Sequence, residues 1–120
     1  MDKQIGAAYV FRRETDAWVL EQKLSPMDGR LERKLFGTSV AIQDTQLVCG
    51  AYAAESTTGV FGGAVYVFRR IDTVWEQEAK LTPLEVEDGD AFGSAVAMGG
   101  DSIFVAAPGN DAACPGDPEI

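Results

Sequence analysis

The stretch GAVYVFRR at residues 63–70 repeats, with a single change, the stretch GAAYVFRR at residues 6–13. The similarity continues past these octets, because GAAYVFRRETDAWVLEQKLSP from Gly6 aligns with GAVYVFRRIDTVWEQEAKLTP from Gly63, 57 residues further on. A second pair lies 56 residues apart, FGTSVAIQDTQLVCGAY from Phe36 and FGSAVAMGGDSIFVAAP from Phe92. Matches this dense over two units indicate that one structural unit is duplicated in the chain.

Each unit divides into four short runs with the composition of β-strands. In the second copy the runs cover residues 63–70, 74–81, 93–98 and 102–107. Val, Ile, Tyr, Phe and Trp gather in these runs, and Gly, Asp, Thr and Pro gather between them. The connections ETDA, IDT, QDTQ and GGDS are short and polar, which favours antiparallel hairpins.

The alternation of side chains predicts which faces of these strands are buried, because successive strand residues point to opposite sides. In residues 63–70 one face carries Ala64, Tyr66 and Phe68, and the other carries Val65 and Val67. Both faces are apolar, so this strand is expected to be covered on both sides.

The run at residues 74–81 differs, since only one of its faces is apolar. That face holds Trp75, Ala79 and Leu81, while charged side chains occupy the other face and must reach solvent. The runs that begin at Gly37 and Gly93 carry small side chains that let neighbouring sheets approach closely. Four strands with tight packing at one edge and an amphipathic strand at the other predict a blade of a β-propeller. A β-sandwich, the competing all-β fold, should show one solvated face more uniformly and no repeat of this size.

The phrases FGTSVAI followed by VCGAY, and FGSAVAM followed by VAAP, resemble the FG-GAP repeat of integrin α-subunit propellers and of many surface proteins. The resemblance extends from Gly6 to Gly109, with Tyr52 in place of the motif's Pro and Ala106 in place of its Gly. In that family FG opens the innermost strand, GAP ends the second, and the Trp-bearing strand is the outermost. The resemblance therefore implies structural roles for the motif residues Phe36, Gly37, Gly50, Ala51, Phe92, Gly93, Ala107 and Pro108, and for Trp18 and Trp75 in the outer strands.

The resemblance also sets the order of the blades along the chain. Residues 1–120 are expected to form a single propeller segment, with the outer strands of a first blade at 6–26, a complete blade at 36–81 and the inner strands of a third at 92–109. Propellers close with 4 to 8 blades, so about two blades cannot form a ring alone. The chain can be a fragment of a longer protein, a unit that closes with other copies of itself, or an open stack. Because exposed strand edges invite association, we expect a fragment completed by further blades.

The bulk composition excludes several classes of partner. A net charge of −9 repels nucleic acid and anionic lipid heads. The chain has neither a long apolar run nor the pattern of a signal peptide at its start, which argues against membrane insertion. An extracellular or cell-surface location is implied by the family resemblance alone.

Cofactor chemistry has little support in the sequence. The chain has no His and only two cysteines, of which Cys49 is expected to be a buried apolar residue, whereas the pairing state of Cys114 stays open. Many FG-GAP blades bind calcium in the first hairpin, but here the hairpins offer only Asp44 and Asp101, too few ligands for that ion. Calcium is therefore not expected there.

A second acidic segment, LEVEDGDAFG, contains the metal candidates Asp88 and Asp90. A solvated acidic turn explains the same residues without any bound ion, and we favour that explanation because charge runs are usually solvated surfaces.

The expected function is binding and not catalysis. Neither a nucleophile motif nor a phosphate loop is present, so we expect no enzyme activity. The resemblance implies a scaffold for interaction or adhesion that binds protein or carbohydrate through its loops. Phe61, in the loop AAESTTGVFG, is the candidate contact residue, unless its ring folds back onto the blade. The alternative is a structural propeller attached to a larger extracellular enzyme.

Overall fold

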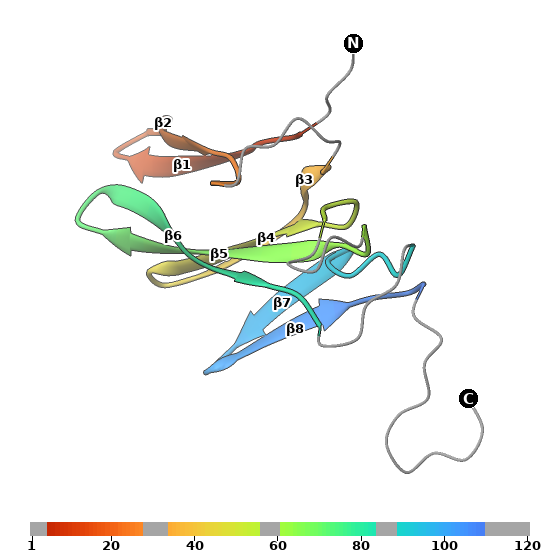
Figure 1. Cartoon of the computed structure of the whole chain (residues 1–120). Helices are drawn as coiled ribbons and strands as arrows, with labels where there is room; N and C mark the ends of the chain where they lie inside the picture. Colours follow the sequence, from red (N-terminus) through yellow and green to blue (C-terminus); the bar gives the residue numbers. More distant parts are fainter. Residues whose placement is uncertain (1–4, 28–33, 56–60, 84–88, 110–120) are drawn as a thin grey trace.

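Three antiparallel sheets stack face to face in the computed structural model, which describes residues 5–27, 34–55, 61–83 and 89–109 (Figure 1). The first is the hairpin of β1 and β2, the second contains β3 to β6 in sequence order, and the third is the hairpin of β7 and β8. The strands are β1 (Ala8–Glu14), β2 (Ala17–Leu24), β3 (Phe36–Gln43), β4 (Gln46–Ala51), β5 (Ala64–Ile71), β6 (Val74–Leu81), β7 (Ala95–Gly99) and β8 (Ser102–Ala106).

This arrangement confirms the predicted all-β fold, in which one complete blade is flanked by two half blades. The described residues contain no helix, and each strand pairs antiparallel with its neighbour. Two-residue turns join the strands of each hairpin at one end of the blades, and at the other end the chain leaves β2, β4 and β6 and enters β3, β5 and β7 (Figure 1).

Glycines set the distance between successive sheets. Gly63, at the start of β5, forms an isolated parallel bridge with Phe92 just before β7, and Gly6 forms the same bridge with Phe36. The backbone of Gly63 has a φ of 103°, and a Cβ there would lie 2.1 Å from the Phe92 carbonyl oxygen. Any side chain would therefore force the two backbones apart. The glycines of the duplicated octet are required by contact between blades.

A first apolar cluster fills the space between the β1–β2 hairpin and the central sheet. Tyr66 and Phe68 of β5 meet the Phe36 ring edge-on, with ring centroids 5.4 Å and 6.0 Å from it. Leu24 is buried in the same cluster, and Val10 of β1 packs against it. Aromatic pairs in this geometry are more favourable than area burial alone.

A second apolar cluster covers the opposite face of the central sheet. Val48, Val65 and Val67 are buried there, and side chains of the β7–β8 hairpin pack against them. Tyr66 and Phe68 face one neighbour, whereas Val65 and Val67 face the other, as the alternation along residues 63–70 predicts.

The prediction that residues 74–81 bury a single face is wrong. Val67 pairs with Ala79 but Phe68 pairs with Gln77, so Glu78 is an extra residue at a β-bulge. The bulge reverses the direction of the side chains beyond it. Trp75 is therefore buried in the first cluster, whereas Ala79 and Leu81 pack in the second.

Equivalent tryptophans occupy opposite environments in the two copies. Trp75 is 4% exposed beneath the β1–β2 hairpin, while Trp18, at the same position of the first half blade, is 67% exposed. Because the described residues place no sheet over Trp18, the two positions separate the effect of burial from that of residue type.

We expect Trp75→Ala to lower the free energy of unfolding by about 3–5 kcal/mol, since it empties a buried aromatic site. Trp18→Ala should change it by less than about 0.5 kcal/mol, as is usual for exposed positions. Urea unfolding, at a dilution where light scattering shows a monomer, measures both. Equal losses for the two variants would contradict the assigned burial.

Candidate functional site

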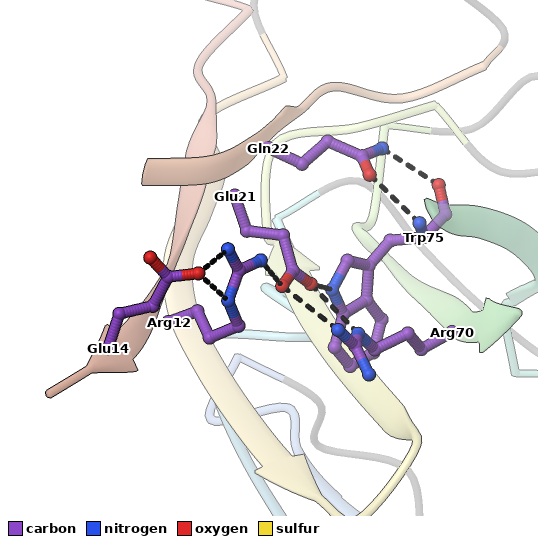
Figure 2. Close-up of polar contacts among 6 residues, drawn as sticks. All are labelled: Arg12, Glu14, Glu21, Gln22, Arg70 and Trp75. Atoms are coloured by element: carbon purple, nitrogen blue, oxygen red, sulfur yellow. Dashed lines mark hydrogen bonds and ion pairs between the residues drawn. The ribbon is translucent and has the colours of Figure 1, made fainter. Parts of the chain in front are cut away.

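A charged cluster around Glu21 joins the β1–β2 hairpin to the central sheet. Val10 pairs with Gln22 and Phe11 pairs with Leu20, so Glu21 is the extra residue of a β-bulge. Bulges redirect side chains. Here the Glu21 side chain lies against the β5–β6 hairpin with only 4% of its surface exposed (Figure 2).

Each of the two carboxylate oxygens of Glu21 accepts two hydrogen bonds (Figure 2). Oε2 accepts from Trp75 Nε1 at 2.6 Å and from Arg70 Nε at 2.9 Å. Oε1 accepts from Arg12 Nη1 at 2.9 Å and from Arg70 Nη2 at 3.1 Å. Arg70 and Trp75 belong to the complete blade, and Arg12 belongs to the same hairpin as Glu21. The carboxylate thus ties two blades together.

These contacts exclude proton transfer by Glu21. The Arg70 guanidinium, opposed by burial and assisted by Trp75 and Arg12, lowers the pKa of Glu21 from 4.5 to about 2. The group therefore stays ionised at neutral pH and cannot act as a general acid. Its roughly four lone-pair positions are all occupied, so no lone pair remains for a ligand. We interpret the cluster as a structural clamp between blades.

Gln22 completes the clamp by binding the backbone of the outer strand. Its Nε2 donates to the Trp75 carbonyl at 2.8 Å, and its Oε1 accepts from the Trp75 amide at 2.8 Å (Figure 2). Because β6 is an edge strand of its sheet, this side-chain amide takes the place of a strand partner.

This cluster was not predicted from the sequence, although the repeat contains a signal for it. Glu21 corresponds to Glu78 and Arg13 corresponds to Arg70 at the same 57-residue spacing. Charged residues that recur in register with core residues indicate a contact repeated between blades.

The predicted site residues do not form one constellation. Phe61 lies at the end of the β4–β5 connection and is 45% exposed. Asp90 is buried just before β7, and its backbone carbonyl accepts a hydrogen bond from the Gly109 amide at 2.9 Å. Asp88 and Cys114 lie outside the described residues. Within the described ranges, His, Cys, Asp and Glu side chains form no group of three or more that could hold a metal ion.

The motif residues lie where neighbouring sheets touch. A Cβ on Gly37 would be 2.5 Å from the Ala7 carbonyl oxygen, and one on Gly50 would be 2.0 Å from that of Gly93. Ser39 Oγ also donates to the Gly93 carbonyl at 2.8 Å. Ala51 is fully buried, while Ala107 and Pro108 follow β8 at the end of the described chain.

Cys49 is fully buried in the first apolar cluster, in the middle of β4. Burial raises the pKa of its thiol to about 12. The thiolate, which is the reactive form, is thus absent at neutral pH, and Cys49 acts as a small apolar residue.

Comparison with known proteins identifies the repeat. The family model described as FG-GAP repeat matches residues 18–68 and 75–118, and the two segments begin at the equivalent residues Trp18 and Trp75. No curated protein matches the chain significantly. None of the described residues belongs to a helix long and apolar enough to cross a membrane.

Glu21→Gln should lower the free energy of unfolding at pH 7 by about 1.5–3 kcal/mol, because the hydrogen bonds to Glu21 are charge-assisted. The pKa of Glu21 is depressed in the folded state, so its contribution is complete above pH 4.5 and is lost as the pH falls towards about 2. The difference between wild type and variant should therefore vanish over this range. Urea unfolding at several pH values measures it, with Glu76→Gln at an exposed position of β6 as the control. A difference that is independent of pH, or an equal loss in the control, would contradict the clamp.

In a Cys114→Ser variant, Cys49 should resist iodoacetamide at pH 8 and react fully in denaturing urea. Mass spectrometry after timed labelling follows the reaction. Rapid modification of the native protein would show that β4 is accessible to reagent.

Proposed function

Because the chain belongs to the FG-GAP repeat family, we propose that it is a non-catalytic β-propeller segment acting as an interaction or adhesion scaffold. It binds protein or carbohydrate through its loops, as part of a secreted or surface protein. Membership of the family supports this class of function, and the contacts around Phe61 support the position of the binding surface.

The two ends of the blades differ in what they can offer a ligand. At one end the described residues form two-residue turns, such as Asp44–Thr45 and Asp72–Thr73. At the other end the chain leaves β4 and β6 and enters β5 and β7, each time after a connection of more than ten residues. Binding residues are usually found on loops that a rigid scaffold holds in place. We therefore place the ligand at the end with the long connections.

The main support for this position is Phe61, whose side chain is exposed while the backbone around it is held by hydrogen bonds. The Phe61 carbonyl accepts a hydrogen bond from the Gly89 amide of the next blade at 3.4 Å. Two residues later, the Gly63 amide donates to the Ala54 carbonyl at 3.0 Å. An aromatic side chain with few rotatable bonds on an ordered backbone offers contact area at a low entropic cost.

The groups most suited to catalysis are used in packing. Glu21 is saturated by its hydrogen bonds, and the Cys49 thiol is buried. We also propose that binding needs no calcium, since each two-residue turn in the complete and third blades supplies at most one carboxylate.

The wild-type chain should bind at least one ligand on an array of glycans and extracellular proteins, and Phe61→Ala should weaken that binding at least tenfold. Loss of a central aromatic contact commonly costs about 2 kcal/mol or more, which corresponds to such a change. Ile71→Ala removes a residue of similar exposure at the opposite end of the blade and should leave binding unchanged. Addition of EDTA should also leave it unchanged.

An equal effect of both substitutions would contradict the position of the site. Absence of any bound ligand would contradict the scaffold function and favour a structural propeller attached to an enzyme.

A further inference from the structure

The two half blades expose the residues whose counterparts form the core of the complete blade. By the repeat, β1–β2 corresponds to β5–β6, and β7–β8 corresponds to β3–β4. Phe11 is 53% exposed where Phe68 is 3% exposed, and Phe104 is 62% exposed where Val48 is fully buried. Exposed apolar faces of this kind mark interaction surfaces.

The free strand edges of the half blades are also counterparts. Within the complete blade, β4 pairs with β5 along its length. In the described residues, β8 pairs only with β7 and β1 pairs along its length only with β2. Among the described residues, the first half blade thus has only the two outer strands of a blade, and the third has only the two inner strands.

We propose that β8 of one copy of this chain pairs antiparallel with β1 of a second copy, so that two half blades make one composite blade. The pairing in the complete blade supplies the register. Since Val48 pairs with Val67 and Cys49 with Tyr66, Phe104 lies opposite Val10 of the second copy, and Val105 lies opposite Tyr9.

A groove between β1 and β3 receives the Phe104 side chain. It has a volume of about 510 Å³ and is lined by apolar residues that include Val10, Val40 and Ile42. Val40 and Ile42 are exposed, whereas their counterparts Val96 and Met98 pack against the cluster that contains Val48. The pairing would place Phe104 against Val40 and Ile42 in the corresponding position.

In the same register, an acidic side chain of one copy lies opposite a basic side chain of the second copy. Glu21 accepts hydrogen bonds from Arg70 and Trp75 of the next blade. The counterpart of Glu21 is Glu78, which is exposed and accepts a hydrogen bond from Gln46 Nε2 at 3.3 Å. In the composite arrangement Glu78 meets Arg13 and Trp18 of the second copy, which are exposed counterparts of Arg70 and Trp75. The same neighbour thus receives both Phe104 and Glu78.

One position departs from the repeated geometry. Gly50 lies so close to the next blade that a Cβ there would be 2.0 Å from the Gly93 carbonyl oxygen, and its counterpart in β8 is Ala106. The Ala106 methyl group therefore holds the two copies further apart than adjacent blades within the chain. Removing that methyl group should tighten the association.

The eight described strands of each copy amount to two blades, and propellers close with 4 to 8 blades. Head-to-tail pairing of this kind therefore closes with two, three or four copies, each of 12.8 kDa. Closing the ring pairs the β1 and β8 edges that an open row of copies would leave unpaired at its two ends.

Light scattering coupled to size exclusion tests the pairing. The wild-type chain should form a discrete oligomer of two to four copies. Phe104→Asp should convert it to a monomer without loss of fold by circular dichroism, because Phe104 is exposed in the single chain. Ile71→Asp, also at an exposed site, should leave the mass unchanged, and Ala106→Gly should lower the dissociation constant. A monomeric wild type, or an oligomer that Phe104→Asp does not dissociate, overturns the proposal.

Charge reversal tests the register. Glu78→Arg and Arg13→Glu should each raise the dissociation constant at least about tenfold, and the double variant should restore it to within about threefold of wild type. A double variant as weak as the single ones overturns the proposed register.

Discussion

The close approach of backbones at glycine is the constraint on which the rest of the structure depends. Gly6 contacts Phe36 and Gly63 contacts Phe92, in each case the Phe of the FG motif in the next blade. The distances leave no room for a Cβ on either glycine. The Phe92 amide donates to the Gly62 carbonyl at 2.8 Å across this contact, and the Phe36 amide donates to the Ile5 carbonyl at 2.8 Å. Because the sheets are fixed at this distance, their faces are close enough to share apolar clusters. The glycines of the repeat therefore make possible the burial of the Val, Tyr and Phe side chains beside them.

The Glu21 clamp holds the outer strands of the first blade against those of the complete blade. Its ionised carboxylate is nearly inaccessible to solvent, and it is tolerated there because Arg12, Arg70 and Trp75 supply four hydrogen bonds. Apolar packing alone would let two flat sheets slide over each other, whereas these directed bonds specify one alignment. Contacts at both Gly6 and the clamp therefore fix the first blade against the complete blade.

The sequence was sufficient to predict the strands, the blade and both buried faces of β5, because those features follow from periodicity within a duplicated unit. It was insufficient for β6, since the bulge at Glu78 changes the direction of side chains without changing the composition of the strand. The same kind of bulge positions Glu21, and for that reason the clamp was missed, although Glu21 and Glu78 recur in register. Of the predicted site residues, Phe61 is exposed and Asp90 is buried, but exposure alone does not identify a ligand. Ligand chemistry depends on the loop surface, which the repeat does not encode.

Unfolding of Gly63→Ala compared with Gly89→Ala is the most direct test of the contact between blades. Both glycines have positive φ, 103° and 84°, so both substitutions carry backbone strain, but only at Gly63 would the new methyl group meet the next blade. Around Gly89, no atom of the described residues other than its chain neighbours lies within 4 Å of the added Cβ. We predict that Gly63→Ala loses at least about 2 kcal/mol more in free energy of unfolding than Gly89→Ala. Equal losses would show that the glycines serve local backbone conformation only, and would contradict the account.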